Sequence, residues 1–265
     1  MKASPSGDFS VRSVTFYRRQ QRVLHDISLA VALGECVALI GPNGAGKSSL
    51  LKIFSGDLSP HSGEVRLDGI PLTAWDRQKI ARRRAVLPQQ SELLFPLPVR
   101  DIVLMGRFPH YVGKATVKDE QIVDEAMCTT DVAELWNRPY DQLSGGQKQR
   151  VQLARVLAQV WPQDSAIGGF LLLDEPTTGL DLAHQHAFLR TVRNFTRVGL
   201  GVLIVLHDLN LAMQYADRVM ILHHGNNAAC DSPEKALQPE LIRRIFAVKM
   251  QILHTPRPVL VPVDE

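Results

Sequence analysis

Several features that mark specialised classes of protein are scarce or missing in this 265-residue sequence. Cysteine occurs three times, at Cys36, Cys128 and Cys230, without the CxxC spacing of zinc or redox sites, which suits a reducing compartment. Residues 1–11 have no apolar core, so no signal peptide is indicated. No apolar run approaches the roughly 18 residues that a membrane-spanning helix needs. We therefore expect a chain that is soluble on its own.

An excess of charge of one sign is missing as well. The chain has 30 Lys and Arg residues and 27 Asp and Glu residues, which gives a net charge of +3. This balance lacks the basic footprint of a nucleic-acid-binding protein, and no nucleic-acid partner is predicted. The length allows one large domain or two small ones, and no internal repeat or low-complexity linker divides the chain.

The apolar residues form two kinds of strand pattern. Segments 9–16, 23–31 and 63–69 mostly alternate, which predicts antiparallel strands with one exposed face. Four runs are apolar throughout and predict strands covered on both faces in a largely parallel sheet: CVALI (36–40), FLLLD (170–174), VLIVLH (202–207) and VMILH (219–223). Helical patterns lie between them, at 48–54, 119–128, 147–159 and 182–197. This alternation of strands and helices predicts an α/β layer architecture.

A phosphate-binding loop follows the first of the buried strands. The sequence fits G-x-x-x-x-G-K-[ST] at every fixed position, in Gly41, Pro42, Asn43, Gly44, Ala45, Gly46, Lys47 and Ser48. Glycines let backbone N–H groups point at phosphate oxygens, and the following helix adds its positive N-terminus. Lys47 is expected to reach the β- and γ-phosphates and Ser48 to ligate Mg²⁺. Ser49 is a further candidate phosphate contact.

Polar residues also follow two other buried strands. Asp174 and Glu175 end FLLLD, and His207 ends VLIVLH. Because ligands of open α/β sheets bind beyond the carboxyl ends of the strands, these residues and the phosphate loop should form one site. We expect Asp174 to hold Mg²⁺, Glu175 to orient or deprotonate the attacking water, and His207 to contact the γ-phosphate or that water.

A second glycine turn, LSGGQ, occupies residues 143–147 and precedes a helical pattern. Ser144 is placed to cap a helix whose exposed N–H groups favour an anion. Other polar residues carry weaker patterns: Gln89 is typical of a surface glutamine and Tyr17 of a tyrosine packed in a sheet. The histidine pairs at 184/186 and 223/224 lack the spacing and third ligand of a metal site.

Together these motifs resemble the ATP-binding subunits of ABC transporters over nearly the whole chain. The resemblance rests on the phosphate loop, LSGGQ, FLLLDE (170–175), TGLD (178–181) and His207. It implies an α/β P-loop NTPase of the ABC ATPase type, with a mostly parallel sheet core and an N-terminal antiparallel β subdomain. It also implies one domain over residues 1–265, with an inserted helical subdomain at about 90–160.

The resemblance assigns roles that pattern alone does not. It makes Gln89 the Q-loop glutamine, a catalytic residue and Mg²⁺ ligand, and Tyr17 the aromatic residue that stacks on adenine. It also implies a head-to-tail homodimer in which the LSGGQ turn of one chain closes over ATP bound by the other. The residues of that turn are Ser144, Gly145, Gly146 and Gln147. Two cradles per chain thus serve two composite sites.

Other segments resemble those of particular importers. VLMGRFPH (103–110), LDLAHQ (180–185) and HDLNLAMQYADRV (207–219) are similar to importers of iron chelates, haem and cobalamin. Residues 81–90 and 160–169 look most like those of bacterial hemin importers. The resemblance implies a peripheral ATPase on the cytoplasmic face of the inner membrane, with two copies of a permease subunit and, indirectly, a periplasmic substrate-binding protein. A permease helix would dock near Gln89 and residues 90–140.

Two other functions compete with transport. Soluble ABC proteins that act on DNA or ribosomes carry long coiled-coil insertions or two cassettes, and this chain has neither heptads nor a second cassette. A GTP-binding switch would need an N-K-x-D guanine reader, which does not occur. Within transport, a ferric-siderophore or cobalamin importer is the alternative to a hemin importer.

Overall fold

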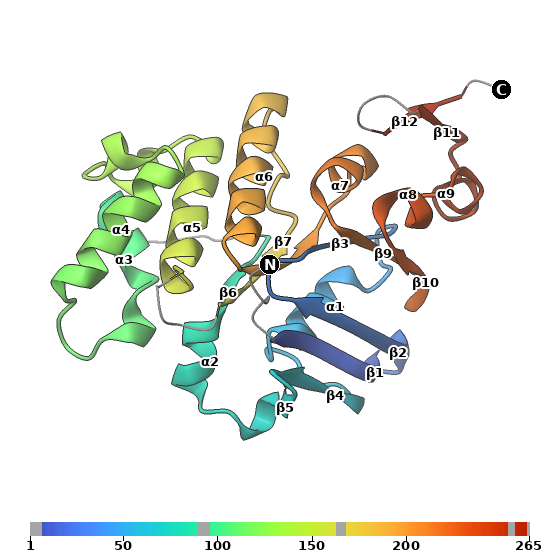
Figure 1. The fold of residues 1–265 in the computed structure, drawn as a ribbon, viewed down its shortest axis with the longest axis horizontal. Coiled ribbons are helices and arrows are strands. Elements are labelled where there is room, and N and C mark those ends of the chain that lie inside the picture. Colours follow the sequence, from blue (N-terminus) through green and yellow to red (C-terminus); the bar gives the residue numbers. More distant parts are fainter. Residues whose placement is uncertain (1–6, 90–95, 163–167, 254–257, 264–265) are drawn as a thin grey trace, which may run out of the picture.

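The computed structural model describes residues 7–89, 96–162, 168–253 and 258–263, and its centre is a six-stranded sheet (Figure 1). The strands lie in the order β10-β9-β3-β8-β7-β6, and β10 runs antiparallel to β9 while the other pairs are parallel. Their bounds are Cys36–Ile40 (β3), Arg84–Leu87 (β6), Phe170–Asp174 (β7), Gly201–Val205 (β8), Arg218–His223 (β9) and Asn226–Asp231 (β10). The four fully apolar runs of the sequence form the neighbouring strands β9, β3, β8 and β7.

Both faces of this sheet are covered, which explains why its central strands lack polar alternation. In β3, Val37 and Leu39 pack toward the antiparallel sheet and α1, whereas Ala38 and Ile40 pack toward helices on the other face. Successive side chains of a strand point to opposite faces, so every residue of β3 is buried. The covering helices are α1 (Lys47–Phe54), α5 (Gly145–Gln159), α6 (Leu182–Arg197) and α7 (Leu209–Tyr215).

An antiparallel sheet of four strands packs over α1, in the order β2-β1-β4-β5. Its bounds are Asp8–Arg18 (β1), Gln21–Ala32 (β2), Ser62–Leu67 (β4) and Ile70–Pro71 (β5). In β2, Leu24, Ile27, Leu29 and Val31 are buried while their neighbours are exposed. The alternation in the sequence therefore predicted this sheet correctly.

A third apolar core holds together the helices between β6 and β7. These are α3 (Val99–Met105), α4 (Val117–Thr129) and α5, which lie side by side at one end of the molecule (Figure 1). The short helices η2 (Phe108–His110), η3 (Ala133–Leu135) and η4 (Tyr140–Gln142) also lie in this stretch, whereas η1 (Leu72–Ala74), which contacts β4, and α2 (Arg77–Arg83) precede β6. Part of the stretch 90–160 predicted as a helical subdomain lies outside the described residues, at 90–95.

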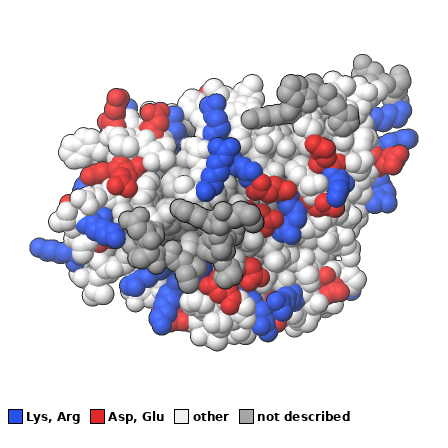
Figure 2. Space-filling view, in the orientation of Figure 1, with Lys and Arg blue, Asp and Glu red and all other residues white. Residues whose placement is uncertain are grey.

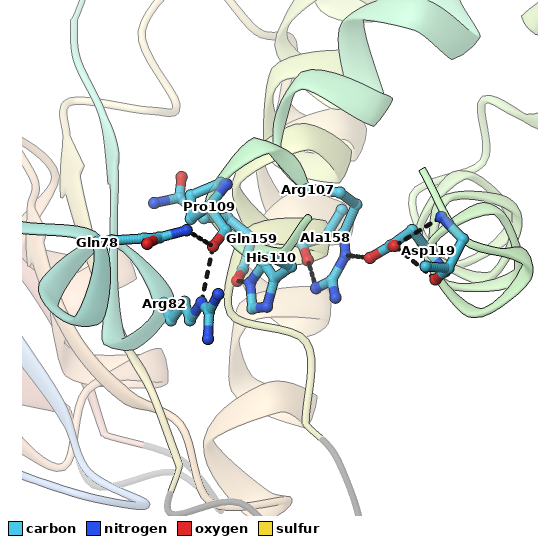
Figure 3. A network of polar contacts seen from close by, with 9 residues as sticks. Gln78, Arg82, Arg107, Pro109, His110, Asp119, Ala158 and Gln159 are labelled. Carbon is cyan, nitrogen blue, oxygen red and sulfur yellow. Dashed lines mark hydrogen bonds and ion pairs between the residues drawn. The ribbon is translucent and has the colours of Figure 1, made fainter. Parts of the chain in front are cut away.

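Polar contacts tie these helices together and join them to α2 (Figure 3). Arg107 is 2% exposed, and its guanidinium donates to Asp119 Oδ1 at 2.9 Å and to the Ala158 carbonyl at 2.7 Å. The Pro109 carbonyl accepts from Arg82 Nε of α2 at 2.7 Å. A buried charge pair with its hydrogen bonds satisfied fixes the relative positions of α3, α4 and α5.

The C-terminal part follows the main sheet with α8 (Pro233–Ala236), α9 (Pro239–Phe246) and the hairpin β11 (Met250–Leu253) and β12 (Val259–Pro262). Across the described part of the chain, every helix is too short or too polar to traverse a bilayer. Figure 2 shows Lys and Arg side chains interspersed with Asp and Glu side chains over one face, in keeping with the small net charge.

Candidate functional site

The phosphate loop lies between the end of β3 and the start of α1. Gly41 has a φ of +153°, and a Cβ atom there would lie 2.2 Å from the Leu222 carbonyl oxygen. Gly46 precedes α1 with a φ of +104°, and its Cβ would come within 2.9 Å of the Val23 carbonyl oxygen. Glycine is required at both positions because a side chain would be strained and would clash with backbone. The loop thus closes tightly onto the first turn of α1, whose N–H groups lack intrahelical partners.

Lys47 lies inside the loop and is 5% exposed. Its Nζ donates to the carbonyl oxygens of Gly41 at 2.7 Å and Pro42 at 3.0 Å. Burial lowers the pKa of Lys47, and the carboxylates of Glu175 and Asp174 act in the opposite direction. An ammonium group has three donors, so one remains for a phosphate oxygen.

Ser48 and Asp174 meet where α1 begins and β7 ends. Ser48 Oγ donates to Asp174 Oδ1 at 3.2 Å, and Asp174 is 4% exposed. Burial raises the pKa of Asp174, although the hydrogen bond from Ser48 opposes this shift. No ion pair reaches Asp174 from any residue that the structure describes. Hydroxyl and carboxylate oxygens are hard donors that Mg²⁺ prefers, so these two residues fit a magnesium ion.

Glu175 is contacted by two of the other residues predicted for the site. Gln89 Nε2 donates to Glu175 Oε2 at 2.7 Å, and His207 Nε2 lies 2.6 Å from Glu175 Oε1. The Glu175 side chain is 11% exposed and its φ is +50°, a conformation that non-glycine residues rarely adopt and that is often found at functional sites. Gln89 and His207 each lie two residues beyond a strand, β6 and β8. The parallel sheet therefore brings these three residues to one edge.

A hollow of about 450 Å³ opens beside the phosphate loop. Residues 43–49 and Glu175 line it, together with the β1–β2 hairpin and the β9–β10 turn. Tyr17, predicted to stack on adenine, is 37% exposed at the end of β1 and is not among the lining residues. Its ring instead lies edge-on to His61, with 5.3 Å between centroids.

The LSGGQ turn forms a separate hollow of about 320 Å³. Ser144 caps α5: its Oγ accepts from Gln147 N at 3.3 Å, and Gln147 Oε1 accepts from Ser144 N at 3.0 Å. A Cβ at Gly145 would meet no atom within 4 Å, so this turn faces open space. The Gln147 side chain caps the helix through Oε1, and the residue also lines this hollow, so its predicted nucleotide contact stays a prediction.

Some residues beside these hollows were not predicted from the sequence. Arg18, Arg22 and His224 line the phosphate-loop hollow. Asp181 and His184 line the LSGGQ hollow, and His184 Nδ1 lies 2.7 Å from Asp181 Oδ2. The segment LDLAHQ contains this pair and could have indicated it, whereas Arg18, Arg22 and His224 belong to no local motif. None of the described histidines belongs to a group that could hold a metal ion.

A glycine loop joins a buried parallel strand to a helix, its lysine is buried, and an acid ends a neighbouring strand. Fold and site together define the class of P-loop nucleoside triphosphatases. The family model for "ABC transporter" matches residues 24–178. The chain belongs to the ABC transporter family.

Curated relatives agree along almost the whole chain. A protein of Pseudomonas entomophila named hemin import ATP-binding protein HmuV is 47% identical over 248 residues, which cover 94% of this chain and 95% of the relative. A protein of the same name from Gloeobacter violaceus is 47% identical over 244 residues, covering 91% and 89%. Both alignments extend well beyond residues 24–178, the region that the family model matches.

Solved structures show the same fold. A metal-chelate type ABC transporter in an inward-facing conformation is similar with a TM-score of 0.82 at 26% identity, covering 98% of this chain and 99% of that chain. A bacterial ABC transporter cassette solved as a dimer gives a TM-score of 0.74 at 27% identity, covering 85% and 99%. The expected α/β P-loop fold of the ABC ATPase type is confirmed.

Proposed function

We propose that this chain binds and hydrolyses ATP with Mg²⁺ and so powers hemin import through an ABC permease. The observation that carries the proposal is Glu175, held by Gln89 and His207 beside the Ser48–Asp174 pair. The names of relatives that are 47% identical support hemin as the cargo.

Each residue of the site then has a chemical role. The loop N–H groups and Lys47 bind the β- and γ-phosphates. Ser48, Asp174 and the amide oxygen of Gln89 would hold Mg²⁺, which would supply positive charge to offset that of the phosphates. Glu175 accepts a proton from a water molecule. The oxygen of that water attacks the γ-phosphorus, and the bond from the γ-phosphorus to the oxygen of the departing ADP breaks. His207 orients Glu175 and reaches the γ-phosphate.

We further propose that two copies assemble head to tail. The phosphate-loop hollow and the LSGGQ hollow share no lining residue, so each chain carries two separate half-sites. Packing Ser144 of one chain over the phosphate loop of the other completes both sites and buries ATP between them. A similar cassette has been solved as a dimer. ATP binding would favour the closed dimer, and release of the products after hydrolysis would return it to the open state.

The helical end of the chain offers a surface for the permease. Three large apolar residues in the stretch from η2 to the first residue of α4 are exposed: Phe108, Val112 and Val117 are 56%, 92% and 73% exposed. We place the docking of a permease helix here, near Gln89, with two permease subunits per dimer. The ATPase would then sit at the cytoplasmic face of the inner membrane and meet a periplasmic binding protein only indirectly.

Genetic complementation tests the cargo, and a biochemical assay tests the enzyme. In a strain that lacks its hemin-import ATPase and depends on hemin for iron, this chain with its permease should restore growth, whereas the Lys47→Ala variant should not. Rescue with a ferric siderophore or cobalamin in place of hemin would contradict the proposed cargo. Absence of Mg²⁺-dependent ATP hydrolysis by the purified chain and its permease would contradict the enzyme itself.

A further inference from the structure

One wall of the phosphate-loop hollow is built from two turns that lie far apart in the sequence. Arg18 and Arg22 come from the β1–β2 hairpin, and His224 comes from the β9–β10 turn. Neither arginine has an ion-pair partner among the described residues. Unpaired guanidinium groups that line a phosphate-binding hollow are placed to bind an anion.

The pairing of β1 with β2 determines the face of the hairpin on which Arg22 lies. Arg22 lies directly opposite Tyr17 across β1 and β2. Directly paired residues of antiparallel strands project from the same face, so Arg22 shares a face with Tyr17. Unlike Tyr17, Arg22 lines the hollow together with the phosphate loop.

One backbone hydrogen bond and one side-chain contact hold the β9–β10 turn against the same hairpin. His25 N donates to the Gly225 carbonyl at 2.8 Å, and His25 Nδ1 lies 2.9 Å from Asn226 Oδ1. A Cβ at Gly225 would lie 2.4 Å from the Val23 carbonyl oxygen, so the turn approaches β2 as closely as a glycine permits. His224, with a φ of +48°, is therefore positioned by the fold beside the hollow.

The charges of the hollow favour a ligand with several negative charges. Arg18, Arg22 and Lys47 line it, and the acid among the lining residues, Glu175, is already engaged by two side chains. In the proposed function the γ-phosphate lies at the end near Lys47 and Glu175. The hairpin and the turn then flank the other end of the nucleotide.

We propose that Arg22 and His224 bind the α-phosphate and ribose of the nucleotide and thereby position ATP for hydrolysis. The inference rests on the proposed ATPase function and adds a second contact region to it. Because both residues act on parts that ATP and ADP share, they should strengthen the binding of both nucleotides equally. They should leave the chemical step unchanged once the site is saturated.

Arg22→Gln and His224→Asn test the inference, with Arg12→Gln as the matched control on the same hairpin. Arg12 is an exposed arginine of β1, whereas Arg22 lies on β2, and Arg12 does not line the hollow. Asparagine tolerates the positive φ of position 224. Displacement of a fluorescent ATP analogue by ATP and by ADP measures affinity, and steady-state assays of the complex with its permease give KM and kcat. Thermal melting verifies that each variant is folded.

Arg22→Gln should weaken ATP and ADP binding by about fivefold each at low salt, and His224→Asn by about twofold. KM should rise while kcat stays unchanged, and the effect of Arg22→Gln should shrink in about 0.5 M salt because the charge is exposed. Unchanged affinities, or a loss confined to ATP, would overturn the inference. Failure of the unmodified chain to bind ATP would instead overturn the proposed function.

Discussion

Exchange of Glu175 for glutamine removes the negative charge at a carboxylate that both Gln89 and His207 contact. A glutamine amide keeps one acceptor oxygen and replaces the other with a donor. The remaining oxygen can still accept from Gln89 Nε2 (2.7 Å in the unmodified chain), and the new amide donor can face His207 Nε2 (2.6 Å) only when that imidazole adopts the tautomer that accepts there. The change is nearly isosteric, so the surrounding strands need not move.

We expect Glu175→Gln to cost little in the free energy of unfolding and much in the activation barrier of hydrolysis. Loss of one partly exposed hydrogen bond costs about 1 kcal/mol in the free energy of unfolding. Loss of a general base lowers the rate by roughly 10²–10⁴, which corresponds to about 3–5 kcal/mol in the activation barrier. ATP affinity should not fall, because the variant removes a negative charge beside the triphosphate.

Phosphate release measures turnover, equilibrium binding of labelled ATP measures affinity, and gel filtration with ATP measures assembly. We expect turnover to be nearly abolished, binding to be intact and the dimer to accumulate, since ATP cannot be consumed. Glu125→Gln, an exposed carboxylate on α4, serves as the control and should behave as the unmodified chain. Turnover of the Glu175→Gln variant within tenfold of the unmodified chain would refute the role of Glu175.

Three further predictions concern stability, reactivity and the metal. Arg107→Met should lower the free energy of unfolding by about 3–5 kcal/mol in urea titrations, because it leaves Asp119 buried without its cation. Burial raises the pKa of Asp119, but hydrogen bonds from Thr116 and the Arg107 guanidinium outweigh burial and lower it. The ionised Asp119 therefore stabilises the folded chain at neutral pH, and this contribution to the free energy of unfolding should be lost as the pH falls below about 4. Burial raises the pKa of Cys36 to about 12, so a thiol reagent at pH 8 should label it in urea but not in the native protein. EDTA should stop phosphate release and leave the circular dichroism spectrum unchanged.

Much of the fold could be predicted from local patterns. The buried strands Cys36–Ile40 and Phe170–Asp174 and the helix Leu182–Arg197 match their predicted bounds, because uninterrupted apolar runs and a capping Asp181 mark them clearly. The helix predicted from residue 147 begins two residues earlier, at Gly145, because Ser144 is its N-cap. Glycine weakens a helical pattern, so the cap rather than the periodicity fixes this start.

From residue patterns alone, the site could be predicted only for residues that follow buried parallel strands. Glu175 and His207 follow buried strands, and the parallel sheet brings them to one edge, where the structure places them in contact. Gln89 had no distinguishing pattern and entered through the family resemblance. Arg22 and His224 come together through two hairpins separated by most of the chain, and neither hairpin has a motif that predicts the other.

A mixing experiment tests most directly whether the site is shared between two chains. Lys47→Ala disables the phosphate loop and Ser144→Arg fills the LSGGQ turn, so each variant alone should be inactive, provided that melting shows both to be folded. In a head-to-tail heterodimer one site combines both lesions and the other has neither. We predict that an equimolar mixture with the permease recovers about a quarter of the unmodified ATPase activity, since half of the dimers are mixed and each regains one site. A mixture that stays as inactive as its components would contradict the shared site.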